Sequence, residues 1–312
     1  MSATLAGVAT AAIFAIGAVR TPRPALYVAA VAVVLLVWDL PRPGSGATEI
    51  HMLDVGQGDA VALRTQRGRW IIVDVGRGWT GGDAAQTTVL PHLRRYGGRV
   101  AALILSHPHM DHIGGATTLL EATRPAALYD AGFVAPGGGY RRALETAQRL
   151  GIPWRRPTPG DSLVVDEVVL TFLAPDSAWT STLHDANDAS VVVMARIGAR
   201  RMLFTGDAEL AEETWLLANT PHALRADVLK VGHHGSRTST SPAFLAAVQP
   251  AAALISVGAG NDYRHPSPGT LDALSTAGAH ILRTDHVGPI VVRTDGRSLS
   301  IHADGRTWHA PP

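Results

Sequence analysis

The chain has 312 residues, 17% of them charged, and a formal net charge of +1, so it can bury a substantial core and has no overall basic field that would indicate nucleic-acid binding by charge alone. It contains no cysteine, which excludes disulfides, thiolate metal sites and a cysteine nucleophile. Any metal must therefore be held by His, Asp or Glu.

Residues 1–40 are typical of a membrane segment. Residues 1–19 carry no charged side chain and approach the roughly 20 residues that span a bilayer, and a second, shorter apolar run follows at 25–38. A cleaved signal peptide followed by an anchor is the alternative, although no Lys or Arg precedes the first run. We expect one or two transmembrane helices, preferably a hairpin. Arg20 and Arg23 between the runs favour a cytoplasmic loop, which would place the following domain outside the cytoplasm.

A Pro/Gly-rich linker at residues 41–48 precedes a domain that we expect to occupy residues 49–312. Short apolar runs bounded by Gly, Asp or Pro recur through it, as in "WIIVDVG" and "RMLFTGD", and are typical of strands. Segments with helical spacing lie between them, as in "YRRALETAQRLG". Because the strands cluster and helices occur in both halves, a layered α/β architecture with two sheets and outer helices fits better than a doubly wound sheet.

The segment "SHPHMDHIGG" at 106–115 places four metal-binding side chains in one turn after an apolar strand. They are His107, His109, Asp111 and His112. Imidazole and carboxylate groups suit Zn, Mn or Fe, and this set can supply two adjacent metal positions. A solvated polar loop is the alternative, but three unpaired histidines at the end of a buried strand are rare without a metal.

Asp207 ends another apolar strand, in "RMLFTGDAE". The glycine before it lets the carboxylate approach a neighbouring group closely. Taken alone, Asp207 is equally suited to capping the helix "AELAEETW" or to binding a metal.

Two later strand ends carry further histidines. In "DVLKVGHHGSRTS", His233 and His234 follow an apolar strand, and Lys230 and Ser236 beside them suit an anionic oxygen. In "NDYRHPSP", His265 lies between an aromatic residue and a proline, where a simple turn is an equally good explanation.

In chain order, these motifs resemble the metallo-β-lactamase-fold domain of the ComEC/Rec2 DNA-uptake competence protein family. The resemblance covers the domain from about residue 49 to the end and rests on "DVGQGD", "IIVDVG", "SHPHMDHIGG", "NDASVVV", "FTGD", "KVGHHGS" and "NDYRHPSP". It implies an αββα sandwich with a site for two divalent metal ions, Zn or Mn, at one edge. It also implies the ligands: His107 and His109 for the first metal, Asp111 and His112 for the second, and Asp207 between the two.

A later histidine usually completes the second metal in this superfamily, and here it must be His233 or His234. We expect His234, with His233 nearer the substrate. The superfamily also usually has a histidine before the "TGD" strand, where this chain offers Asn187 or Ser190, with His184 as an outside candidate. The first metal is therefore expected to be weaker, differently ligated or selective for Mn. Three earlier carboxylates would orient ligands or shape the adjoining loop: Asp54, Asp59 and Asp74.

The resemblance implies a membrane-anchored, metal-dependent hydrolase, a phosphodiesterase or nuclease that acts on DNA through a metal-activated water. Asp111 and His233 would take part in catalysis. Lys230, Ser236 and His265 would hold the phosphate or protonate the leaving group.

Two other functions are compatible with the sequence. The same fold could hydrolyse a small ester, such as a choline phosphodiester, a lactone or a β-lactam, or the chain could be a non-catalytic accessory of a DNA-uptake assembly. With at most two transmembrane helices, the chain cannot form a DNA channel alone. The hypothesis that it acts on DNA therefore implies a separate channel protein at the cell membrane.

Overall fold

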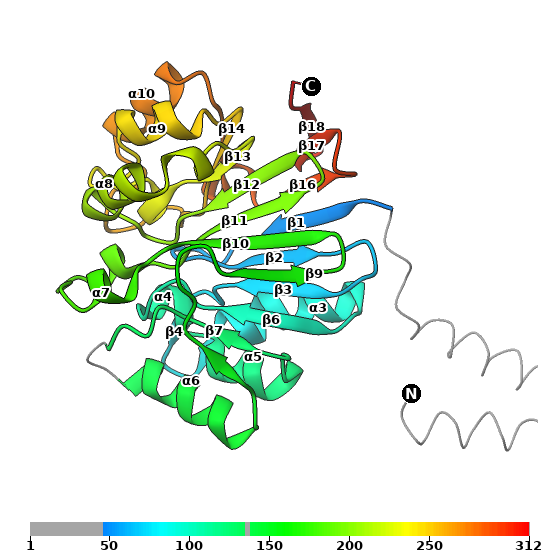
Figure 1. Ribbon diagram of the computed structural model, residues 1–312. Helices are drawn as coiled ribbons and strands as arrows, with labels where there is room; N and C mark the ends of the chain where they lie inside the picture. Colours follow the sequence, from blue (N-terminus) through cyan, green and yellow to red (C-terminus); the bar gives the residue numbers. More distant parts are fainter. Residues whose placement is uncertain (1–45, 135–137, 312) are drawn as a thin grey trace, which may run out of the picture. The chain divides into compact units, whose positions relative to one another are not determined.

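Two β-sheets stack face to face, and helices cover the outer surface of each (Figure 1). The computed structural model describes residues 46–134 and 138–311. Within these ranges, no helix has both the length and the apolar character needed to cross a membrane. The transmembrane hairpin predicted for residues 1–40 lies outside the described residues. The predicted two-sheet architecture with outer helices is confirmed.

The first sheet joins the two ends of the domain, because β1 pairs antiparallel with β16. From β3 to β8 its neighbouring strands run parallel. Its nine strands, in spatial order, are β18 (Arg306–His309), β17 (Leu299–Ala303), β16 (Ile290–Thr294), β1 (Thr48–Met52), β2 (Val61–Arg64), β3 (Trp70–Val73), β6 (Val100–Ile104), β7 (Leu128–Tyr129) and β8 (Trp154–Arg155). A separate two-stranded hairpin consists of β4 (Gly78–Trp79) and β5 (Gly82–Asp83).

The second sheet has seven strands, of which β12 to β15 run parallel. In spatial order they are β15 (His280–Arg283), β14 (Ala252–Ile255), β13 (Val228–Lys230), β12 (Arg200–Phe204), β11 (Val192–Ile197), β10 (Val168–Ala174) and β9 (Ser162–Val165).

Helices pack on both outer faces. The first sheet is covered by η1 (Ala85–Val89), α3 (Leu90–Tyr96), α4 (Met110–Ile113), α5 (Ala116–Thr123) and α6 (Gly138–Arg149). The second is covered by α8 (Leu210–Asn219), α9 (Pro242–Val248) and α10 (Pro268–Thr276). The remaining short helices are α7 (Ser177–Thr180), η2 (Asn187–Ala189), η3 (Pro221–Ala223), η4 (Gly232–Gly235) and α11 (Thr284–Val287).

Central strands such as β3 and β6 are apolar on both faces because each sheet is buried on both sides. In β3, Ile71 and Val73 point into the core between the sheets, whereas Trp70 and Ile72 pack under the outer helices. This alternation is the two-residue period of a strand. The polar residues predicted to bind metal therefore follow the ends of such strands.

Those strand ends meet at one edge of the sandwich. The carboxyl ends of parallel strands lie on the same side of a sheet, so the loops after β3 and β6 adjoin each other, as do the loops after β12 and β13. The two sheets are linked there by a hydrogen bond of 2.8 Å from Val191 N to Ser106 O. The functional residues predicted from the sequence lie along this edge.

One carboxylate on the inner face of α8 is fully buried. Burial raises the pKa of Glu212 well above its ordinary 4.5, and the charges of Asp188 and Glu213 raise it further, against a lowering by the Ser190 backbone. The folded protein therefore holds this proton more tightly than the unfolded chain. The resulting stability is complete below about pH 4.5 and is lost as the pH rises above it.

We expect Glu212→Gln to raise the free energy of unfolding at about pH 8 by at least about 1 kcal/mol, because glutamine never has to be buried with a charge. The gain should shrink toward about pH 5. Denaturant unfolding at both pH values measures it, with Glu145→Gln on the exposed face of α6 as the control. An effect of equal size at both pH values would contradict this interpretation.

Candidate metal centre

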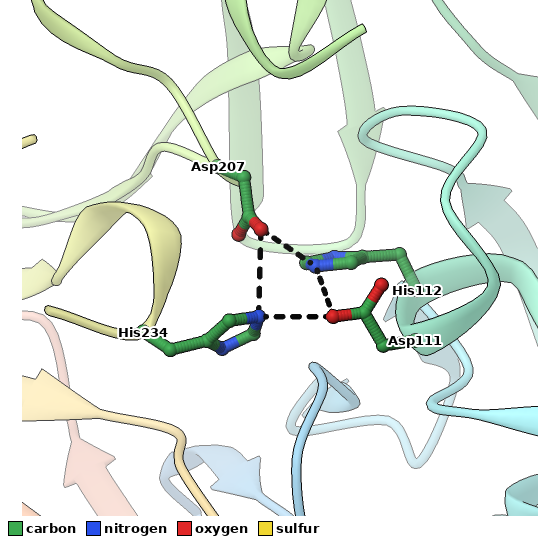
Figure 2. Close-up of side chains that lie close together, drawn as sticks. All are labelled: Asp111, His112, Asp207 and His234. Atoms are coloured by element: carbon green, nitrogen blue, oxygen red, sulfur yellow. Dashed lines mark ion pairs between the residues drawn. The ribbon is translucent and has the colours of Figure 1, made fainter. Parts of the chain in front are cut away.

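Four ionisable side chains point toward a common centre, as Figure 2 shows. Asp111 and His112 come from α4, which follows β6, and Asp207 and His234 come from the loops after β12 and β13. Asp207 Oδ2 lies 3.2 Å from His112 Nε2 and 3.4 Å from His234 Nε2. Asp111 Oδ2 lies 3.4 Å from His234 Nε2 and 3.9 Å from His112 Nε2. All four ligand atoms are within 4.8 Å of one another.

These spacings fit a single divalent ion. Nitrogen and oxygen ligands about 2.0–2.2 Å from a tetrahedral ion lie roughly 3.3–3.6 Å from one another. Two buried atoms that face the centre, His112 Nε2 and His234 Nε2, also lack a well-formed hydrogen bond within the described residues. Because leaving buried polar atoms unsatisfied is costly, their common aim is best explained by a bound cation.

The other nitrogen of each histidine has a partner. His112 Nδ1 donates to Asp74 Oδ2 at 2.9 Å, and His234 Nδ1 donates to the Ser256 carbonyl at 2.8 Å. Asp74 is itself fixed by hydrogen bonds of 2.7 Å from Ser106 N and Oγ. This arrangement leaves Nε2 free for a metal and fixes the orientation of each ring. Asp74 lies behind His112, as expected of an orienting residue.

A second set of potential ligands adjoins the first. His107 Nε2 lies 3.1 Å from His109 Nδ1 and 3.9 Å from Asp207 Oδ2. His107 is buried, and its Nδ1 lies 3.0 Å from Ser106 Oγ. Asp207 Oδ2 therefore faces both sets, which is the position expected of a residue shared by two ions.

The three residues considered in place of the usual histidine have different surroundings. Ser190 is buried, and its Oγ accepts a hydrogen bond of 3.0 Å from Asp207 N, so it holds the backbone of the shared carboxylate. His184 is exposed and does not line the pocket beside the metal centre. Asn187 does line it, and its buried Oδ1 has no hydrogen-bond partner in the described part of the chain. Of the three, Asn187 has the oxygen best placed for a metal.

Lys230 lies behind the metal centre rather than in the pocket. Its buried Nζ contacts the Asp59 carboxylate, donates to the Gly206 carbonyl at 2.7 Å and lies 3.6 Å from Asp207 Oδ1. Burial lowers the pKa of Lys230, but the charges of Asp59 and Asp207 outweigh it and raise the pKa above its ordinary value. The structure thus places Lys230 as the cation that balances these carboxylates, and not on the pocket where its predicted phosphate contact would lie.

Ser236 is also directed away from the pocket. It is buried, and its Oγ is within 2.8 Å of Thr238 Oγ1. In this position Ser236 shapes the turn after the paired histidines, and it does not line the pocket where a phosphate contact was predicted.

The "DVGQGD" loop packs directly on the ligand helix. Asp59 N donates to Asp111 O at 3.2 Å, and a Cβ on Gly58 would come within 2.2 Å of the same carbonyl. Gly58 also has a φ of +130°, which disfavours other residues. The glycine is required for this close approach, which brings the Asp59 carboxylate to within 3.7 Å of His112 Nδ1.

A cavity of about 490 Å³ opens onto the metal centre, and His233 and His265 line it. His233 and His234 have φ values of +44° and +52°, so the backbone is strained and turns the two rings to different sides. His234 faces the metal centre, whereas His233 faces the pocket, with its Nε2 3.8 Å from Asp207 Oδ2. Burial and the charges of His233 and His234 lower the pKa of His265 to about 4. The structure therefore separates the two adjacent histidines that the sequence could not.

Glu209, which was not predicted from the sequence, holds two residues that line the pocket, His233 and Asn187. It accepts hydrogen bonds from His233 Nδ1 at 2.7 Å, Thr238 Oγ1 at 2.9 Å and Asn187 Nδ2 at 3.4 Å. The only signal in the sequence was its position two residues after Asp207, where the start of a helix already explained an acidic residue.

Protons and metal compete for this centre. Burial lowers the pKa of His234, but Asp207 and Asp59 outweigh it and raise the pKa to about 10. Burial also lowers the pKa of His112, but the charges of Asp207 and Asp111 outweigh it and raise the pKa well above its ordinary value. Without a metal, positive charge is thus held on the histidines as protons, and metal affinity should increase with pH.

The chain is similar in sequence to known proteins. The sequence model of the metallo-beta-lactamase superfamily matches residues 53–259. The chain is 32% identical over 268 residues to ComE operon protein 3 of Bacillus subtilis, covering 81% of this chain and 34% of that protein. It is 34% identical over 278 residues to Recombination protein 2 of Haemophilus influenzae, covering 89% of this chain and 32% of that protein. The chain thus spans about a third of the length of these relatives.

The fold also matches a solved structure. The metallo-beta-lactamase fold protein YhfI from Bacillus subtilis aligns with a TM-score of 0.52 and 14% identity, covering 80% of this chain and 100% of that one. At this identity the likeness concerns the fold alone.

Proposed function

Because the chain belongs to the metallo-β-lactamase superfamily, with relatives in the ComEC/Rec2 competence family, we propose that it is a metal-dependent phosphodiesterase that hydrolyses DNA. The observation that carries the proposal is the position of Asp207 Oδ2 between two sets of buried ligand atoms, beside an open pocket. A pair of divalent ions at such a site supplies water activation and stabilises charge during displacement at phosphorus.

We assign the residues as follows. His107, His109 and Asp207 would hold one ion, with Asn187 Oδ1 in place of the usual histidine. The second ion would take Asp111, His112, Asp207 and His234. An amide oxygen is a harder ligand, in the hard–soft acid–base sense, than the histidine nitrogen it would replace. Oxygen ligands favour Mn over Zn at the first position.

The pocket-side histidines would act on the substrate. His233 is positioned by Glu209, whose carboxylate keeps a proton on Nδ1 and so leaves Nε2 facing the pocket. His265 is largely neutral at neutral pH because its pKa is lowered to about 4, so it can accept or donate a hydrogen bond without a charge. Both would orient the phosphate or the leaving oxygen.

Glu209→Gln should lower the kcat for DNA cleavage roughly 10–100-fold, because the amide no longer fixes the tautomer of His233. The ion held by Asp111, His112, Asp207 and His234 should be unchanged, since Glu209 contacts none of these four ligands; its contact with Asn187 concerns the first ion only. Steady-state cleavage assays with parallel elemental analysis measure both, with exposed Glu145→Gln as the matched control. A loss of metal equal to the loss of rate would contradict a positioning role.

We also propose that residues 1–40 anchor the chain in the membrane, that residues 49–312 act outside the cytoplasm, and that a separate protein forms the DNA channel. The relatives named for competence and recombination, which are about three times longer, motivate this placement. Protease access to the domain in intact cells, compared with lysed cells, would test the sidedness.

The enzymatic proposal is tested by incubating the full chain with single- and double-stranded DNA in Mn²⁺, Zn²⁺ or a chelator. We expect metal-dependent cleavage that the chelator abolishes. Intact DNA together with hydrolysis of a choline phosphodiester, a lactone or a β-lactam would overturn it in favour of a small ester.

A further inference from the structure

Exposed apolar side chains gather around the metal pocket. Of the seven large exposed hydrophobic residues in the described part of the chain, three lie on the pocket or beside it: Trp79, Met110 and Tyr263. Trp79 is 45% exposed and Tyr263 is 69% exposed. Isolated exposed hydrophobic residues are ordinary, but a group of them around a site marks a binding surface.

The metal pocket continues into a second cavity. This neighbouring cavity, of about 430 Å³, is lined by Trp79 and Arg142 and shares Gly78 and Met110 with the metal pocket. One groove therefore runs from the metal centre, past Met110, to the indole ring of Trp79.

Trp79 is held at a fixed distance from the metal ligands. It lies on β4, whose backbone packs against α4, the helix that carries Asp111 and His112. The contact is so close that a Cβ on Gly114 would come within 1.9 Å of Gly78 N. A group bound on the indole would therefore sit in a constant position relative to the reacting centre.

Positive charge accompanies this part of the groove. The Arg77 guanidinium lies 5.5 Å from the centre of the Trp79 ring, and Arg142 lines the second cavity. Both are exposed, and neither forms an ion pair within residues 46–134 and 138–311. The nearby carboxylate of Asp83 is occupied by hydrogen bonds from Gln86 N and Thr118 Oγ1. The available charge beside Trp79 is thus cationic.

The metal pocket itself contains a second aromatic pair. Tyr263 and His265 stack with their ring centres 5.8 Å apart and their planes 16° from parallel, and both line that pocket. The groove therefore has aromatic surfaces in both of its connected cavities, with guanidinium groups at the Trp79 end.

We propose that Trp79, with Arg77, forms a subsite for an unpaired nucleobase, and that Tyr263 on His265 forms a second one. Aromatic side chains stack on the face of a base, and that face is open in a single strand but covered in a duplex. The groove would therefore hold a single strand with one base on Trp79, another on Tyr263 and the intervening backbone at the metal centre. This inference rests on the proposed function for its substrate class.

The test is equilibrium binding of a fluorescein-labelled single-stranded DNA to the full chain in a chelator, followed by anisotropy, so that cleavage plays no part. Trp79→Ala should weaken binding roughly 5–100-fold, and Trp79→Phe should retain most of it. Trp154→Ala removes a tryptophan that is 49% exposed but lies outside both cavities, and it should leave binding unchanged. Tyr263→Ala should weaken binding to a similar extent as Trp79→Ala.

A strand with abasic sites separates stacking from charge. The wild-type chain should bind it about as weakly as the Trp79→Ala, Tyr263→Ala double variant binds the normal strand, and duplex binding should not respond to either substitution. Equal binding of the normal strand by the wild type and the double variant, or no binding by the wild type, would overturn the subsites. Base-dependent binding without cleavage after metal addition would instead leave the subsites standing and overturn the proposed hydrolysis.

Discussion

Asp207→Asn should abolish metal-dependent DNA cleavage, with a loss of at least about 10³-fold in kcat. Its Oδ2 lies 3.2 Å from His112 Nε2, 3.4 Å from His234 Nε2 and 3.9 Å from His107 Nε2, so one atom serves both sets of ligands. Asparagine has nearly the same size but no charge, and it cannot compensate two cations at once. The loss therefore comes from the missing charge and not from a cavity.

The variant should be measured for cleavage and for metal content in the same preparation. Asp272→Asn, on the exposed surface of α10, is the matched control, and it should behave as the wild type. Retention of wild-type cleavage by Asp207→Asn would contradict the shared position of this carboxylate.

Lys230→Met should lower the free energy of unfolding by about 3–5 kcal/mol, because it leaves the buried carboxylates of Asp59 and Asp207 without their cation. The pKa of Lys230 is raised in the folded state, so its stabilising charge is fully present below its ordinary value of 10.5 and is lost only as the pH rises above that value. The effect should therefore be constant between about pH 6 and pH 8.

Denaturant unfolding in a chelator measures this effect apart from metal binding. The double variant Lys230→Met, Asp59→Asn should recover part of the loss, since the second change removes one of the uncompensated charges. Arg141→Met breaks an exposed ion pair with Glu145 and should cost less than about 1 kcal/mol. A Lys230→Met variant as stable as Arg141→Met would show that the buried cation is unimportant.

The ligand positions were accessible from the sequence because each follows a short run of buried apolar residues in a strand. A strand buried in a sandwich cannot carry a charged residue in its interior without a partner, so polar residues mark where it ends. The loops after β6, β12 and β13 supply the ligands for this reason. The two-sheet architecture was accessible for a related reason, since runs such as "WIIV" are apolar at every position.

The sequence suggested that Lys230 faces the substrate, whereas the structure buries it behind the metal centre, because the sequence does not show which strand is central. It ends β13, which lies between β12 and β14, so its side chain is enclosed by neighbours on the protein side of the metal centre. Its partner, Asp59, comes from the loop between β1 and β2, at the opposite end of the domain's sequence. Pairings of this kind depend on tertiary contacts that neither spacing nor periodicity reports.

Glu209 was missed, and His233 and His234 were left unresolved, for a local reason. An acidic residue at the start of a helix needs no functional explanation, and adjacent histidines in an extended backbone would simply alternate sides. The observed left-handed conformations at both histidines change that geometry. Only the folded backbone shows that one ring faces the ligands while the other meets Glu209.

The most direct test of this account is the metal content of the purified full chain. Elemental analysis after dialysis at about pH 8 should find two divalent ions per chain in the wild type and fewer than one in Asp207→Asn. A folded wild-type chain that binds no divalent metal under these conditions would contradict the account, because the unsatisfied ring nitrogens of His112 and His234 would then need another explanation.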